Sequence, residues 1–141
     1  MTEQAKNQAV LARFFEMAGQ GDVPGALALI DETCVWTYSA STDFIPFAGT
    51  FHGREGVLAF FQGAAEHVRI ERMEIDRVET FGDTLIVRGR ETSTAHATGE
   101  TFEAQWLHLV RIKHGLITRY DEYVDSAVIA RGIATLAKPE A

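Results

Sequence analysis

The residues best suited to chemistry in this 141-residue sequence are one histidine and two adjacent carboxylates near its C-terminal end. His108 lies in an apolar, aromatic segment that predicts a β-strand, and Asp121 and Glu122 lie in a second such segment. Ionisable groups on an apolar surface cost free energy unless they are paired or hydrated. A histidine titrates near neutral pH, and a neighbouring carboxylate can fix its tautomer or abstract a proton itself. The pattern therefore indicates either a proton-transfer pair in a pocket or a buried structural pair.

The turn between these two strands decides which carboxylate lies beside His108. A two-residue loop would place Asp121 on the face of His108. A type I turn followed by Gly115 as a left-handed bulge residue would place Glu122 there instead. The single glycine at the third loop position favours the second arrangement, so we predict Glu122 as the acid of the pocket.

A third carboxylate, Glu91, lies in a segment whose two faces differ in polarity. It shares the less polar face with Leu85 and Val87, whereas Arg88 and Arg90 lie on the other face. A carboxylate in this position is either paired with an arginine or has its pKa raised by burial. We interpret Glu91 as a structural ion pair or an exposed strand end.

The sequence has more aromatic residues than a core of this size requires, and some are expected to line a cavity for a flat apolar ligand. The loop over residues 39–53 is unusually apolar, and we expect it to fold over the pocket mouth or against a subunit partner. His52, at the end of this loop, fits a turn or the pocket rim equally well. The predicted substrate-binding residues are Trp36, Tyr38, Phe47, His52, Phe60, Trp106 and Tyr120.

Hydrophobic periodicity predicts the elements that position these side chains. Helices are predicted over 4–19, 24–30 and 54–66, with a short C-terminal helix after Asp125 or Ser126. Strands are predicted over 33–39, 68–81, 85–97, 101–113 and 116–124. Helices followed by a meander of long antiparallel strands predict one α+β domain with its helices on one face of a curved sheet.

Composition restricts the classes of partner. The net charge of −7 and the pI of about 5.2 disfavour nucleic acid, since phosphate backbones bind basic surfaces. No apolar run is long enough to span a membrane, and Cys34, the only cysteine, fits a reducing compartment, so we expect a cytoplasmic protein. No HExxH, glycine-rich phosphate loop or GxSxG motif occurs, so we expect neither a metal nor another cofactor.

Three segments resemble the nuclear-transport-factor-2-like (NTF2-like) superfamily, close to its SnoaL-like and ketosteroid-isomerase-related branches. They are the N-terminal helices that lead into Val35-Trp36-Thr37, residues 45–57 with Phe60-Phe61, and the closing hairpin over 108–125. The resemblance covers nearly the whole chain, and we therefore expect residues 1–141 to form a single SnoaL-like (NTF2-like) domain. It implies a cystatin-like or NTF2-like α+β barrel, in which a cone-shaped, curved antiparallel sheet wraps around the N-terminal helices. It also implies a homodimer formed through the outer face of the sheet.

The resemblance also implies which residues work together. SnoaL-like polyketide cyclases pair a histidine on the penultimate strand with an acid on the last strand, positions that His108 and Glu122 match. We therefore expect a cofactor-independent acid–base enzyme, of isomerase, cyclase or hydrolase type, that acts on a small apolar carbonyl compound. Glu122 would transfer the proton, and His108 would assist it or polarise the carbonyl group. The alternative is a non-catalytic ligand-binding or association dimer.

Overall fold

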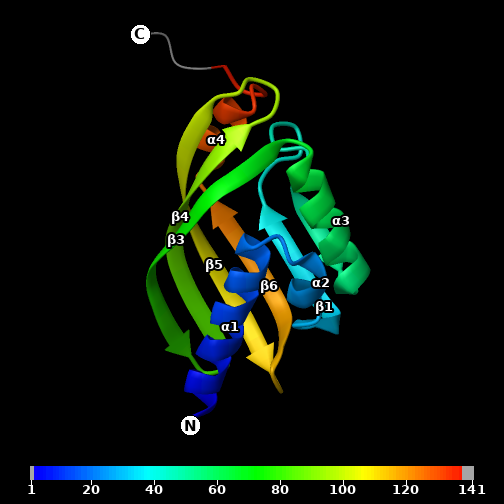
Figure 1. Ribbon diagram of the computed structural model, residues 1–141, viewed down its shortest axis with the longest axis vertical. Coiled ribbons are helices and arrows are strands. Elements are labelled where there is room, and N and C mark those ends of the chain that lie inside the picture. Colours follow the sequence, from blue (N-terminus) through cyan, green and yellow to red (C-terminus); the bar gives the residue numbers. More distant parts are fainter. Residues whose placement is uncertain (1, 138–141) are drawn as a thin grey trace.

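A six-stranded curved sheet, partly wrapped around helices, forms the framework of the protein (Figure 1). The computed structural model describes residues 2–137. The strands are β1 (Ile30–Ser39), β2 (Gly49–His52), β3 (Val68–Phe81), β4 (Thr84–Ala95), β5 (Thr101–Lys113) and β6 (Leu116–Val124). They lie in the order β2-β1-β6-β5-β4-β3. The helices are α1 (Glu3–Gly19), α2 (Val23–Leu27), α3 (Gly53–Ala65) and α4 (Ser126–Gly132).

The α+β class and the curved sheet predicted from the sequence are confirmed, with one difference in strand direction. Strands β3 to β6 form the predicted antiparallel meander. Strand β1, however, pairs with β6 in the parallel direction, so the sheet is mixed. The long stretch of chain between the two strands makes this possible, because parallel neighbours need a crossover rather than a hairpin.

Helix α2 is shorter than the predicted helix over 24–30, and β1 begins earlier than predicted. Leu29 and Ile30 already pair with β6: Ile117 N donates a hydrogen bond to Leu29 O (2.8 Å), and Ile30 lies opposite Ile117. Pairing with a buried strand therefore overrides the local helical pattern. Strand β4 also ends two residues before the predicted boundary at 97, where the chain turns into β5.

The apolar loop over residues 39–53 contains a strand that was not predicted. Strand β2 has only four residues and pairs with β1 in the antiparallel direction. Ile45 and Phe47, which precede it, are buried in the core, whereas Phe44 is 44% exposed. The loop therefore packs inward through Ile45, Phe47 and Ala48.

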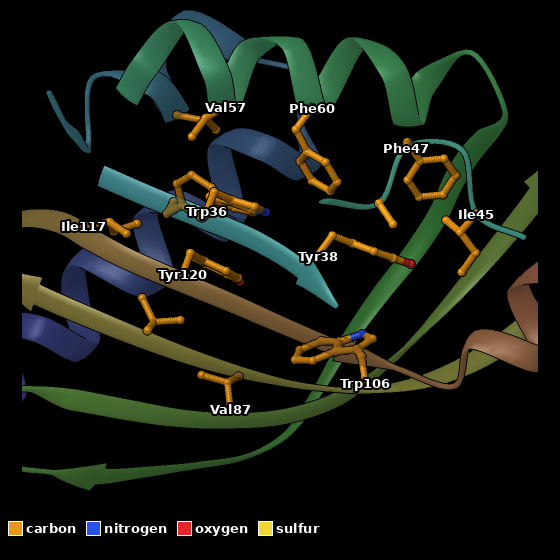
Figure 2. Packing of buried hydrophobic residues seen from close by; sticks show 14 of the residues in the cluster. Trp36, Tyr38, Ile45, Phe47, Val57, Phe60, Val87, Trp106, Ile117 and Tyr120 are labelled. Atoms are coloured by element: carbon orange, nitrogen blue, oxygen red, sulfur yellow. The ribbon is translucent and has the colours of Figure 1, made fainter. Parts of the chain in front are cut away.

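The core is rich in aromatic side chains and lies between α3 and the sheet (Figure 2). Trp36 of β1 stacks on Tyr120 of β6 with ring centroids 3.9 Å apart, and Phe60 of α3 lies 5.6 Å from Trp36. Phe14 of α1 approaches the same rings at 5.8 and 5.9 Å. Aromatic side chains of the helices therefore pack against aromatic side chains on the inner face of the sheet.

Candidate active site

His108 and Glu122 lie opposite each other on β5 and β6 and point into the interior. His108 Nε2 is 3.2 Å from Glu122 Oε1, and the side chains are 2% and 10% exposed. The predicted pairing of His108 with Glu122 is thus present in the structure. The two ionisable side chains are buried in the core as partners, and their interaction offsets the free-energy cost of burying either one alone.

The turn before β6 differs from the one predicted. His114 and Gly115 have φ angles of 52° and 77°, the geometry of a two-residue type I′ loop rather than a type I turn with a bulge at Gly115. Such a loop, continued as a regular ladder, would place Asp121 opposite His108. Glu122 occupies that place only because the ladder is interrupted further along β6.

The interruption is a β-bulge at Thr118. The ladder between β5 and β6 shifts by one residue between the pairs made by Ile117 and Arg119, and Thr118 is the extra residue. Its hydroxyl donates to the carbonyl of Arg111 (3.3 Å). The bulge keeps Ile117 buried and also turns Glu122 inward, two requirements that a regular strand from this turn could not meet together.

A chain of hydrogen bonds holds the pair in one orientation. Trp36 Nε1 donates to Glu122 Oε2 (2.8 Å), and His108 Nδ1 lies 2.6 Å from Tyr120 Oη. With Glu122 ionised, its oxygens only accept, so we assign the hydrogen of the neutral imidazole to Nε2 and let Nδ1 accept from the Tyr120 hydroxyl. Each side-chain nitrogen of His108 and each side-chain oxygen of Glu122 then has a hydrogen-bond partner.

The pair opens onto a cavity of about 520 Å³. Its wall is largely aromatic and aliphatic, and it includes Phe14, Phe61 and Met73. His108, Tyr120 and Glu122 form part of the same wall. Volumes of roughly 300–1,000 Å³ with a few polar groups in an apolar lining are typical of small-molecule sites.

Most of the predicted substrate-binding residues line this cavity, and two do not. Those in the wall are Trp36, Tyr38, Phe47, Phe60 and Tyr120. Trp106 is buried behind it and stacks on the His108 ring with centroids 4.0 Å apart. It lies over Gly89, where an added Cβ would come within 2.4 Å of the indole. His52 lies away from the cavity, at the start of α3, in a shallow surface depression with Glu32 and Arg54.

The sequence matches the SnoaL-like domain family over residues 11–120. This chain belongs to the SnoaL-like domain family. The match covers most of the described chain and ends just before Glu122, so the family assignment and the identity of the acid are separate observations. No curated protein shows significant sequence similarity to this SnoaL-like domain.

Solved structures share the fold over nearly the whole chain. An NTF2-like protein from Burkholderia xenovorans LB400 is 29% identical, with 92% of this chain and 96% of that chain covered and a TM-score of 0.79. An NTF2-like protein of unknown function from Burkholderia pseudomallei K96243 is 25% identical, covering 94% and 98%, with a TM-score of 0.83. A candidate SnoaL-like polyketide cyclase from Mesorhizobium loti is 22% identical, covering 87% and 99%, with a TM-score of 0.67.

The SnoaL-like domain carries a second buried carboxyl group, which the sequence interpretation placed wrongly. Glu91 is neither paired with an arginine nor exposed; it is 9% exposed and lines the cavity. Its Oε2 accepts a hydrogen bond from Ser93 Oγ (2.6 Å). Burial raises the pKa of Glu91, with a smaller contribution from the charge of Glu122, and the hydrogen bond from Ser93 partly opposes this. The sequence feature that could have indicated its burial was the position of Glu91 on the apolar face of β4.

Within residues 2–137, no group of three or more His, Cys, Asp or Glu side chains is arranged to hold a metal ion. None of the helices in that range combines the length and hydrophobicity needed to cross a bilayer.

Removing the Tyr120 hydroxyl is expected to destabilise the SnoaL-like domain. In the Tyr120→Phe variant, His108 Nδ1 loses its partner inside the core. We expect the free energy of unfolding to fall by about 1–3 kcal/mol, the cost of a buried unpaired polar atom. Urea denaturation would measure the loss, and ¹⁵N chemical shifts of the His108 ring would report a change of tautomer.

Tyr123→Phe provides the matched control, because Tyr123 lies on the same strand but is 45% exposed. That variant is expected to unfold like the wild type. If Tyr120→Phe were as stable as the wild type, the hydrogen bond between Tyr120 and His108 would contribute nothing to the free energy of unfolding.

Proposed function

We propose that this SnoaL-like domain is a cofactor-independent acid–base enzyme that acts on a small, largely apolar carbonyl compound. The observation that supports this most directly is the contact between His108 and Glu122 at the wall of an apolar cavity. A carboxylate in such a place can serve as a general base, since solvent competes little for its lone pairs. The reaction class is proton transfer at a carbon adjacent to a carbonyl group.

Glu122 is the proposed base. One oxygen accepts from Trp36 and the other contacts His108, which leaves the remaining lone pairs for a ligand in the cavity. Glu122 takes a proton from the carbon, and the electron pair of the broken C–H bond moves into the carbonyl group to give an enolate. In a conjugated enolate, return of the same proton to another carbon completes an isomerisation. Alternatively, the enolate carbon attacks a second carbonyl group of the same molecule, which closes a ring, and Glu122 returns its proton to the new alkoxide oxygen.

His108 is proposed as the partner that balances the charge of Glu122. Its Nε2–H stabilises the carboxylate before the transfer, and Tyr120 prevents the ring from turning. Aromatic stacking with Trp106 further restricts the imidazole plane. The base is therefore held rigidly before a ligand arrives, which reduces the reorganisation needed during reaction.

The proposal can be tested without knowing the natural substrate. The probe is 2-tetralone, an apolar ketone with acidic α-hydrogens, incubated with the intact chain in D₂O. We expect enzyme-dependent exchange of the α-hydrogens, followed by ¹H NMR, at a rate well above that of buffer. Exchange no faster than in buffer, with 2-tetralone shown to bind, would refute the enzyme and favour the alternative, a ligand-binding protein without chemistry.

Association into a homodimer is a separate proposal, which the resemblance to NTF2-like proteins implies. Leu107 and Tyr123 support it, because they lie opposite each other on the outer face of β5 and β6 and are 37% and 45% exposed. Adjacent exposed apolar side chains on a sheet face are typical of a contact surface. This surface lies on the opposite side of the sheet from the cavity, so dimerisation and the proposed chemistry are independent.

A further inference from the structure

We propose that Glu91, as a neutral carboxylic acid, and the hydroxyl of Tyr38 form a second polar group in the cavity, which donates hydrogen bonds to an uncharged oxygen of the ligand and disfavours carboxylate ligands. The inference rests on the proposed function, because it concerns the ligand class of the same site. It assigns specificity to two residues that the acid–base step does not use.

The first support is the hydrogen bonding of Glu91. Ser93 Oγ donates to Oε2, and Oε1 has no hydrogen-bond partner among the described residues. A neutral carboxyl group matches this arrangement: Oε2 accepts from Ser93 as the carbonyl oxygen, and the proton on Oε1 is free to bond to a ligand. An ionised carboxylate would instead present only acceptors to an apolar cavity.

The second support is the set of charges around Glu91. The charge of Glu122 on β6 acts on Glu91. The other charged or titratable side chains in the wall of the same cavity are Tyr38, Arg69, His96, His108 and Tyr120. The neighbours of Glu91 on the adjacent strands, Ala104 and Met73, are uncharged. Within residues 2–137, no lysine or arginine forms an ion pair with Glu91, and its neighbour in the chain, Arg90, pairs with Glu74. Burial next to another acid and without a cation favours the neutral form, as the raised pKa of Glu91 indicates.

The third support is the unused hydroxyl of Tyr38. The ring is 5% exposed and lines the cavity, and no hydrogen bond to its Oη is found in the described part of the chain. Tyr38 lies opposite Glu122 on the neighbouring strand. Burial raises the pKa of this phenol, so the hydroxyl stays protonated and remains a donor.

The cavity offers an anionic ligand little in return. Its one arginine, Arg69, is largely exposed and already holds Glu71 at 2.6 Å. A ligand carboxylate would lie near two buried acids and lose its own hydration. A ketone or ester oxygen accepts hydrogen bonds without that penalty. The ligand class is therefore an uncharged, largely apolar compound with a carbonyl oxygen.

The test measures binding, so that its outcome does not depend on turnover. Three probes of similar shape are compared by equilibrium dialysis: 2-acetylnaphthalene, 2-ethylnaphthalene and 2-naphthoate. For the wild type, we expect the ketone to bind about fivefold more tightly than the hydrocarbon, the affinity gained from one neutral hydrogen bond, and the naphthoate to bind most weakly. Equal affinity for ketone and hydrocarbon, or preference for the naphthoate, would overturn the proposal.

Two variants separate donation by Glu91 from general polarity. Glu91→Met has a similar length without a donor, and we expect its preference for the ketone to be smaller than that of the wild type, because only Tyr38 can still donate, while the hydrocarbon still binds. Glu91→Gln can accept from Ser93 and donate to the ligand, so the preference should persist. An unchanged preference in Glu91→Met would refute the role of Glu91, and Tyr38→Phe tests the second donor in the same way.

The pH dependence supplies a test on the unaltered protein. Glu91 is neutral below its raised pKa and ionised above it, so the preference of the wild type for the ketone should fall as the pH rises through that value. Glu91→Gln retains Glu122, His108 and Tyr38, and its preference should not change with pH. The same pH dependence in both proteins would assign the effect to another group and contradict the proposal. A preference that depends on Glu91 without any exchange of 2-tetralone would uphold this inference and refute the proposed function alone.

Discussion

The Glu122→Gln variant is expected to exchange the α-hydrogens of 2-tetralone about 10²–10⁴-fold more slowly than the wild type, the usual contribution of a general base. Glutamine has the same shape but no carboxylate lone pairs basic enough to take the proton. Its amide oxygen can still accept from Trp36, and its amide nitrogen can donate to His108 in the other tautomer. We therefore expect the melting temperature to change by only a few degrees. Exchange rates from ¹H NMR and thermal unfolding by circular dichroism would be measured on the same samples.

Asp121→Asn is the matched control for Glu122→Gln. Asp121 is the next carboxylate along the chain, but it lies on the opposite face of β6 and pairs with Arg119 at 2.9 Å. The exchange rate of this variant is expected to equal that of the wild type. Equal rates in Glu122→Gln and the wild type would exclude Glu122 as the base, and an unfolded Glu122→Gln would instead make the pair with His108 a structural one.

The partner of His108 was predicted from the sequence, but through a turn that the protein does not use. Local residues favour one loop or another, and Gly115 is compatible with both. The deciding feature is the bulge at Thr118, which depends on contacts remote in sequence. Ile117 must pair with Ile30 and accommodate the carbonyl of Leu29, while the rest of β6 follows a different register along β1. A single strand's alternation carries no information about such a second neighbour.

The wall of the cavity was largely predictable, because inward-facing aromatic residues follow from strand and helix periodicity. Glu91 shows where this reasoning was incomplete. Its position on the apolar face was visible in the alternation with Leu85 and Val87, but the absence of an arginine near it depends on the faces of neighbouring strands. Arg90, the nearest candidate in sequence, pairs with Glu74 on the outer face at 2.9 Å. The positions of His52 and Trp106 relative to the cavity likewise depend on packing in three dimensions.

Replacing Trp36 is expected to have the largest effect on stability, because this one side chain joins the core to the site. Its ring contacts Tyr120, Phe60, Phe61 and Phe14, and its Nε1 donates to Glu122. Trp36→Ala removes both contributions, and we expect it to lower the free energy of unfolding by about 3–5 kcal/mol. Trp36→Phe keeps most of the packing but leaves Glu122 Oε2 without its donor, for an expected cost of about 2 kcal/mol. Urea denaturation of both variants would give the two values.

Trp106→Phe distinguishes the hydrogen bond from the loss of indole volume. Trp106 is as deeply buried as Trp36, yet its Nε1 has no hydrogen-bond partner in the described part of the chain. The same substitution there loses packing and removes an unpaired donor, so it should cost less than Trp36→Phe. If the two Trp→Phe variants were equally destabilised, the bond to Glu122 would add nothing to stability. A larger loss at Trp36 would mean instead that the aromatic core stabilises the fold and fixes the carboxylate of the proposed base through the same indole ring.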